Sequence, residues 1–323
     1  MLRQINILIL SILTGLFLVS CDDIFEEDIS NESIFLVSPN DGAEIEGNFA
    51  TLQWQSLEDA ENYRLEIKSE TTGFIKDTLS ASSNVVIPLS ADEYSWRVRG
   101  ENSAYETSYS FERSFTMIDI NDLTSQIVFL NTPSIDLFTQ SDELILSWNE
   151  INAATGYELV VDLIVEGETM NVINETGLLS PTFLLNEVSI MTDGAYKWSV
   201  KAFNDQSETI FSNRFFFIDN ELPAAPGLID PENEEFLNTT ESIVLDWMIP
   251  EDIGEIQSQI SSVYELANDQ NFQDIIDVET LTDESSNAEI QTLTTGTYFW
   301  RVRLIDEAGN QGEWSEIRSF TIA

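Results

Sequence analysis

The spacing of the tryptophan residues constrains the fold of this chain more than any other feature of the sequence. Six of its seven Trp residues form three pairs, each with an early and a late member, and 102 residues separate consecutive late members. The pairs are Trp54 with Trp96, Trp148 with Trp198, and Trp247 with Trp300. Chance does not produce this spacing, so we expect three copies of one structural unit.

Each copy repeats the same sequence around its Trp pair. The early Trp precedes a Tyr-led run, the late Trp lies two residues after another Tyr, and the copy closes on Arg-x-Phe. The runs begin at Tyr63, Tyr157 and Tyr264, the second Tyr residues are Tyr94, Tyr196 and Tyr298, and the closing motifs begin at Arg113, Arg214 and Arg318. Apolar and polar residues alternate in these runs, which indicates strands with one buried face. We therefore predict an all-β chain of antiparallel β-sandwiches.

The repeat resembles fibronectin type III domains and related bacterial immunoglobulin-like modules. The resemblance is carried by the early Trp, by the Tyr before the late Trp, and by Asp306-x-Ala308-Gly309-Asn310 ahead of Trp314-Ser315. It implies a tyrosine corner in each copy, in which that Tyr hydroxyl bonds to nearby backbone. It implies no particular function, because this fold carries many unrelated ones.

We expect the three domains at residues 35–118, 124–219 and 224–323, joined by short linkers. In the third copy 17 residues separate Trp247 from Tyr264, whereas the matching interval is 9 in the other two. An insertion of roughly Ile249–Gln257 therefore lengthens one loop at an end of the third domain.

Residues 1–20 are expected to be a lipoprotein signal peptide. Arg3 precedes an uncharged, mostly apolar stretch from Ile7 to Val19. As a helix it would cover about 20 Å, less than the roughly 30 Å of a bilayer core. Leu18-Val19-Ser20-Cys21 resembles the lipobox of bacterial lipoproteins, which implies that Cys21 is acylated and becomes the mature N-terminus. An uncleaved anchor and ordinary secretory cleavage are the alternatives.

Residues 21–34 are expected to be an acidic tether. The run Asp22-Asp23-Ile24-Phe25-Glu26-Glu27-Asp28 resembles the export signal that sends lipoproteins of the Bacteroidetes to the cell's outer face. This resemblance implies a chain that is lipid-anchored to the outer membrane and displayed at the cell surface. A periplasm-facing position is the alternative, and a solvated tether is compatible with both.

Composition excludes several functions. The chain has 58 Asp and Glu against 13 Lys and Arg, so it would repel nucleic acid. It has no His, so a Ser-His-Asp triad cannot be built and the commonest transition-metal ligand is missing. Acidic pairs are expected from composition alone and do not indicate a glycosidase. We therefore predict a protein that is not an enzyme.

Calcium is the one cofactor that the sequence suggests. Asp119, Asn121 and Asp122 lie in the first linker and loosely resemble the calcium-binding linker of cadherins. Calcium takes six to eight oxygen ligands, so these residues would need help from acids in nearby loops. Leu123 stands where that family has Asn, and a solvated linker without calcium is the alternative.

Trp314 has no Trp counterpart in the other copies, where Tyr109 and Ile210 are expected to take its place. Trp314-Ser315 resembles the Trp-Ser sequences of cytokine-receptor fibronectin domains. The resemblance implies a cation–π ladder with Arg301 and Arg303. A ligand-binding role for Trp314 is the alternative.

The sequence as a whole favours a non-enzymatic surface lipoprotein that presents binding or adhesion domains to a protein or glycan ligand. Two alternatives remain, a glycan-capture lipoprotein beside an outer-membrane transporter and a structural spacer in an envelope complex. Four aromatic residues discriminate among them, because exposure on one shared face favours capture and burial favours a spacer. They are Phe74, Tyr105, Phe138 and Phe272.

Overall fold

The computed structural model of the protein describes residues 26–73, 75–141, 143–186, 192–238, 242–282, 285–291 and 293–323. These residues form strands, turns and loops, and none of them is helical. No helix long and apolar enough to cross a membrane is found in these ranges. The predicted all-β fold class is confirmed.

The strands of the described residues fall into three consecutive groups of eight. The first group is β1 (Leu36–Ser38), β2 (Ala43–Glu46), β3 (Phe49–Trp54), β4 (Asn62–Ser69), β5 (Ile75–Ser80), β6 (Asn84–Pro88), β7 (Asp92–Glu101) and β8 (Arg113–Ile118). The second group is β9 (Leu130–Thr132), β10 (Leu137–Thr139), β11 (Leu144–Trp148), β12 (Gly156–Val165), β13 (Glu168–Leu178), β14 (Thr182–Leu185), β15 (Gly194–Phe203) and β16 (Ser212–Ile218). The third group is β17 (Gly227–Asp230), β18 (Glu235–Leu237), β19 (Ile243–Met248), β20 (Ser261–Ala267), β21 (Ile275–Leu281), β22 (Asn287–Ile290), β23 (Gly296–Ile305) and β24 (Arg318–Ile322).

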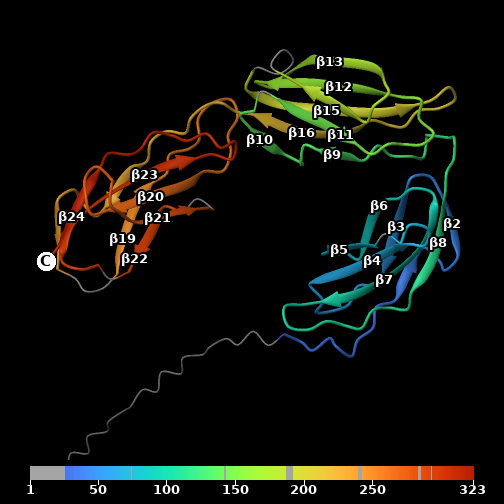
Figure 1. The fold of residues 1–323 in the computed structure, drawn as a ribbon, viewed down its shortest axis with the longest axis horizontal. Coiled ribbons are helices and arrows are strands. Elements are labelled where there is room, and N and C mark those ends of the chain that lie inside the picture. The colour runs from blue at the N-terminus through green and yellow to red at the C-terminus, as the bar shows by residue number, and fades with distance from the viewer. Residues whose placement is uncertain are drawn as a thin grey trace, which may run out of the picture. The chain divides into compact units, whose positions relative to one another are not determined.

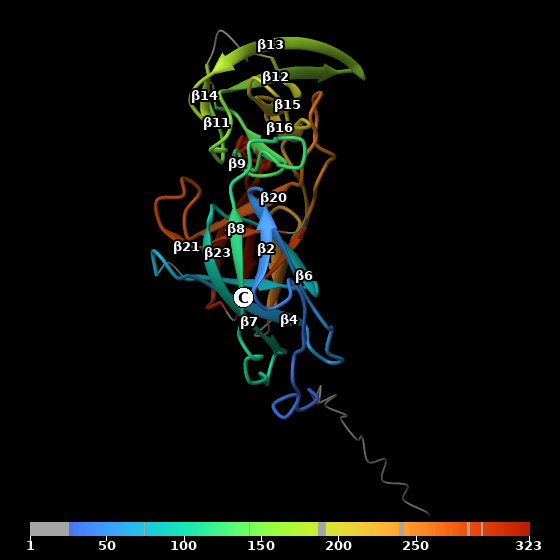
Figure 2. The ribbon, with the colours of Figure 1, turned by 90° about the vertical axis from the view of Figure 1, so that its right-hand side faces the viewer.

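Each group folds into one three-stranded and one five-stranded sheet (Figure 1). In the first domain the strand orders are β1-β3-β6 and β2-β8-β7-β4-β5. The second domain repeats them as β9-β11-β14 and β10-β16-β15-β12-β13, and the third as β17-β19-β22 and β18-β24-β23-β20-β21. The short edge strand β2 runs beside β8 (Figure 2), as β10 does beside β16 and β18 beside β24. The predicted array of three tandem sandwiches is confirmed.

The chain divides into two compact units. Of the described residues, those up to 43 form one unit with those in 51–87 and 93–115, and this unit includes most of the first domain. The other is built from residues 44–50, 88–92 and 116–323, and it holds the second and third domains. Contacts between the second and third domains therefore lie inside one unit.

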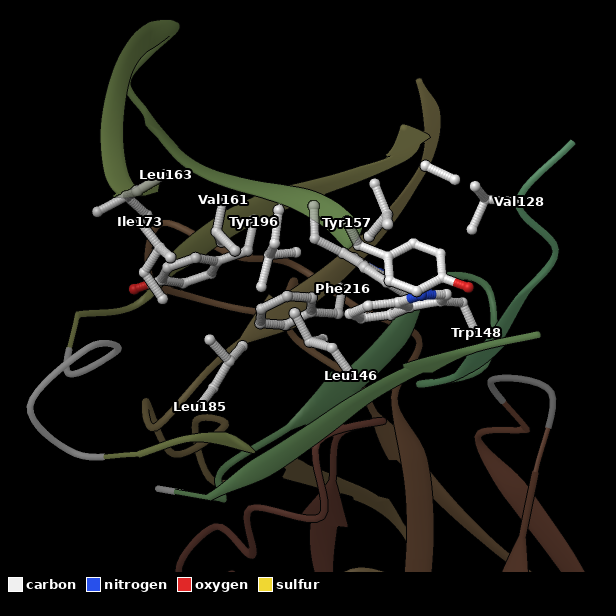
Figure 3. Close-up of a cluster of buried hydrophobic side chains, with 14 of the residues drawn as sticks. Val128, Leu146, Trp148, Tyr157, Val161, Leu163, Ile173, Leu185, Tyr196 and Phe216 are labelled. Atoms are coloured by element: carbon white, nitrogen blue, oxygen red, sulfur yellow. The ribbon is translucent and has the colours of Figure 1, made fainter. Parts of the chain in front are cut away.

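The second domain shows how the alternating sequence builds a core (Figure 3). On β15, Tyr196, Trp198 and Val200 are fully buried, while Lys197 and Lys201 lie on the opposite face. Successive strand residues point to opposite faces, so one apolar stripe is enough to cover the inner side of a sheet. Removing these large side chains from water is the main stabilising contribution to such a sandwich.

Two ring pairs recur in every domain. The early Trp lies against the first Tyr of its repeat, which belongs to the facing sheet, with ring centroids 5.5, 5.4 and 6.4 Å apart. The second Tyr lies against the Phe of the closing motif on the adjacent strand, at 5.6, 5.0 and 5.6 Å. All six paired Trp residues are buried, so they belong to the cores of the three sandwiches.

The tyrosine corner is confirmed in two domains. The hydroxyl of Tyr196 donates to the backbone oxygen of Thr192 at 2.9 Å, and that of Tyr298 donates to Thr294 at 2.8 Å. Each bond satisfies a buried polar group locally and leaves the ring free to pack in the core.

The insertion changes one core contact of the third domain. In the first two domains the Tyr that follows the early Trp accepts a backbone N–H from six residues earlier, at 2.9 Å in both. In the third domain Tyr264 instead donates to the carboxylate of Asp277 on β21, at 3.0 Å. Burial and the Asp277 carboxylate raise the pKa of the Tyr264 hydroxyl.

The Arg of each closing motif ties the last strand of its domain to the first strand and to the Pro that follows it. Its guanidinium donates to backbone carbonyls on both sides of a Pro that follows a cis peptide bond. The acceptors are Val37 and Pro39 for Arg113, Leu130, Asn131 and Pro133 for Arg214, and Ile229 and Pro231 for Arg318. The repeated Arg thus closes each sandwich at one corner.

The end of the predicted tether packs against the first domain. Ile29 and Ile34 are both buried, and Ile34 fills the space beside Gly100 on β7. The Asn102 side chain donates to the backbone oxygen of Glu27 at 3.0 Å.

We predict that Arg214→Met destabilises the second domain by about 2–3 kcal/mol, because its carbonyl partners lose a charged donor. Urea unfolding of the full chain, followed by Trp fluorescence, measures this cost. Lys197→Met removes the same charge from the outer face of β15 and should change stability by less than about 0.5 kcal/mol. Equal costs for the two variants would contradict this role of the Arg.

Candidate functional site

The sites predicted from the sequence lie in different parts of the chain. Cys21 falls outside the described residues, and its lipidation stays a prediction. Phe74 also falls outside them.

The other discriminating aromatic residues do not share an exposed face. Phe138 is half-buried and stacks on Phe217 with ring centroids 4.6 Å apart, and Phe272 is buried. Tyr105 is the exposed one of the three, at 40% of its surface. The burial of Phe138 and Phe272 therefore favours a structural spacer over capture of a glycan or protein at these aromatic residues.

The insertion of the third domain borders an open groove. The groove has a volume of about 700 Å³ and lies between the end of β19 and the loop that leads to β20. Its lining includes Met248, Ile249, Pro250, Asp252, Ser258 and Ile260. Met248 is 60% exposed, so an apolar side chain is available there to a partner.

The acids of the first linker have separate protein partners. The Asp119 carboxylate accepts from the side chain of Asn152 at 3.0 Å, and the Asp122 carboxylate accepts the N–H of Thr124 at 3.0 Å. Hydrogen bonds from Thr124 lower the pKa of Asp122. Asn121 uses its backbone oxygen to accept from the side chain of an Asn that follows β15. Calcium binding by Asp119, Asn121 and Asp122 stays a prediction.

A different set of acids converges where the second domain meets the third. Asp219 follows β16, Asp252 lies in the insertion, and Asp306 follows β23. One oxygen of each lies within 4.8 Å of the others. Their exposed fractions are only 1%, 8% and 5%.

Two of these carboxylates are held by protein donors. Asp252 accepts the backbone N–H groups of Ile253 at 3.0 Å and Ser258 at 2.9 Å. Asp306 accepts the backbone N–H and the side-chain amide of Asn310, both at 2.9 Å.

The third carboxylate, Asp219, is only half satisfied. Its Oδ1 accepts the N–H of Glu221 at 3.0 Å, while its buried Oδ2 has no hydrogen-bond partner among the described residues. Burial raises the pKa of Asp219 to about 6, and the neighbouring carboxylates of Asp306 and Asp252 add to the effect.

Sequence reasoning missed this cluster although it had named each of the three segments. The linker, the insertion and the Asp306 turn each contain several polar residues, and the chain is acidic throughout. Only the folded arrangement singles out one acid from each segment.

The predicted cation–π ladder is confirmed. The Trp314 ring lies 4.1 Å from the Arg301 guanidinium and 4.7 Å from that of Arg303. Phe272 lies against Arg301 at 4.1 Å, and Glu265 forms an ion pair with the same guanidinium at 2.7 Å. Trp314 is therefore part of the outer face of the large sheet.

The prediction that Ile210 takes the place of Trp314 in the second domain is wrong by one residue. Phe211, not Ile210, packs its ring against a cation, Lys201, at 5.1 Å. Tyr109 and Trp314 lie four residues before the Arg of their closing motifs, whereas Phe211 lies three residues before Arg214. The residue four before Arg214 is Ile210, which is why the sequence pattern predicted it. Tyr109 takes the expected place in the first domain, 4.2 Å from Arg97.

We predict that Trp314→Leu destabilises the third domain by about 1–2 kcal/mol, because Arg301 and Arg303 both lose their contact with the indole ring. Trp314→Tyr, which installs the residue type of the first domain, should recover at least half of that loss. Urea unfolding of the full chain measures both variants. A Leu variant as stable as the original would show that the ladder contributes nothing.

Comparison with known proteins gives structural similarity only. No protein-family model and no curated protein sequence matches the chain. A crystal structure of the chicken CNTN1 FN1–FN3 domains aligns at 17% identity, covering 90% of this chain and 97% of that one, with a TM-score of 0.45. The fibronectin(III)-like modules of Clostridium thermocellum CbhA align at 11% identity, covering 61% of this chain and 94% of that one, with a TM-score of 0.38. The fold assignment of this chain rests on its own sheets and core.

Proposed function

We propose that the protein is a non-enzymatic, lipid-anchored surface lipoprotein that binds a protein partner through the groove of its third domain. The fibronectin III-like fold suggests a binding or structural role. The groove carries the binding part of the proposal, because it combines exposed apolar surface with acidic groups.

The chemistry of the groove favours a basic and partly apolar protein segment. Met248, Ile249 and Pro250 supply apolar contacts, and Asp246 and Glu251 lie on the same lining. The whole chain has a formal net charge of −45, so it would attract a basic partner and slow the approach of an acidic one.

The anchoring part of the proposal rests on the sequence. Leu18-Val19-Ser20-Cys21 and the acidic residues after it support acylation of Cys21 and display at the cell surface. Several acyl chains of the kind that bacterial lipoproteins carry would give stable membrane attachment.

A structural spacer is the second candidate. It is favoured by the half-buried Phe138 and the buried Phe272, and by the direct contacts between the second and third domains. It differs from the first candidate in needing no partner at the groove.

We predict that Cys21→Ala abolishes membrane attachment in a Bacteroidetes host. Labelled palmitate should enter the original chain but not the variant, and the variant should leave the membrane fraction. Proteinase added to intact cells should digest the original chain if it is displayed at the surface. Protection from the proteinase until the cells are lysed would contradict surface display.

Selection of a random peptide library on the full chain tests the groove. We expect enriched peptides to combine Lys or Arg with apolar residues and to bind Met248→Asp at least tenfold more weakly. Ile145→Asp changes another exposed apolar residue, on β11, and should leave their affinity unchanged. Peptides that bind all three chains equally would contradict a binding groove and favour the spacer.

A further inference from the structure

The acidic cluster of Asp219, Asp252 and Asp306 has an unbalanced charge. No Lys or Arg in the described part of the chain forms an ion pair with any of the three. Each is more than nine-tenths buried, where an ionised carboxylate without a cation is strongly disfavoured. Their mutual repulsion adds to this cost because the oxygens lie close together.

The unpartnered atom of the cluster belongs to Asp219. Its Oδ2 is buried and accepts no hydrogen bond from any described residue. Native proteins rarely leave such an atom without a partner, which can be a protein donor, a water molecule or an ion. Protein donors hold the other two carboxylates of the cluster, those of Asp252 and Asp306, in place.

We propose that Asp219, Asp252 and Asp306 bind one calcium ion at the junction of the second and third domains. Ca²⁺ takes oxygen ligands at 2.3–2.6 Å, so two oxygens on one ion can lie at most about 5 Å apart. The 4.8 Å limit on the separation of these oxygens meets that condition. An all-oxygen set of carboxylates selects a hard cation over zinc or copper. Further backbone or water oxygens would complete the coordination.

The ion would join three segments that already touch. The side-chain amide of Asn310 donates to the backbone oxygen of Asp219 at 2.9 Å, which links the Asp306 turn to the linker. The N–H of Glu307 donates to the hydroxyl of Ser258 at 3.1 Å, which links that turn to the loop before β20. Calcium would therefore hold the linker, the insertion and the Asp306 turn together.

The insertion also contacts the second domain directly. Glu255 accepts the backbone N–H of Glu166, in the turn between β12 and β13, at 2.7 Å. A Cβ at Gly312 would collide with the backbone oxygen of Pro223, so only Gly allows that close approach of turn and linker. These contacts give the bound ion a preformed site and a structural role.

Calcium titration of the full chain in detergent, after treatment with EDTA, tests the site. Calorimetry should show one saturable calcium ion per chain, and calcium should raise the Tm by about 5 °C or more. Asp219→Asn should weaken binding at least tenfold. Glu289→Gln removes the charge of an exposed acid on β22, so it is the matched control and should retain the affinity of the original chain.

The direction in which Asp219→Asn shifts the melting temperature, without and with calcium, gives a second readout. In EDTA, Asp219→Asn should melt at a higher temperature than the original chain, because it removes one buried negative charge. In saturating calcium this order should reverse. If Asp219→Asn does not fold, Asp252→Asn undergoes the same two measurements.

Three results would overturn the proposal. The first is calcium affinity that Asp219→Asn or Asp252→Asn leaves unchanged. The second is weak, non-saturating binding that Glu289→Gln reduces as much as they do, which is the behaviour of a diffuse acidic surface. The third is tighter binding of magnesium than of calcium.

Discussion

Burial of aromatic rings between two thin sheets is the constraint on which the rest of the molecule depends. In each domain the early Trp packs against a Tyr of the facing sheet, and a second Tyr packs against the Phe of the closing motif. A small sandwich has little interior, so a few large side chains must supply most of its buried apolar area. Side chains alternate between the two faces of each strand. When the rings occupy the inner face, charged residues such as Lys197 therefore lie on the outer face. The Arg of the closing motif then ties the last strand of its domain to the first strand.

Much of this could be predicted from the sequence because it is periodic. The Trp pairs predicted three sandwiches, Tyr196 and Tyr298 form the expected corners, and Trp314 forms the expected ladder. The prediction at Ile210 was wrong because the repeats were aligned residue by residue. The second domain has one residue fewer before Arg214, so the aromatic ring that packs against a cation belongs to Phe211. The cluster of Asp219, Asp252 and Asp306 was not predictable. Its members come from three segments and differ from dozens of other acids only in their burial and proximity.

The three domains repeat one design, and the third carries an insertion in the loop between β19 and β20. That loop displaces the usual partner of Tyr264, borders the groove beside Met248, and contributes Asp252 to the acidic cluster. The buried charge there can be neutralised in two ways, by a bound cation or by a proton shared between carboxyl groups. A cation would make the position of the groove depend on calcium. With a shared proton, the structure of the junction would not depend on a metal ion. The proposed site therefore connects the chain's acidic composition to the insertion of the third domain.

A crystal structure of the full chain grown with calcium, measured at a wavelength where calcium scatters anomalously, tests this claim most directly. We predict one anomalous peak at the junction, about 2.3–2.6 Å from an oxygen of each of Asp219, Asp252 and Asp306. The absence of a peak, with Asp219 Oδ2 at hydrogen-bonding distance from a carboxyl oxygen of Asp252 or Asp306, would contradict it. That result would mean that a shared proton, and not a metal ion, balances the buried charge.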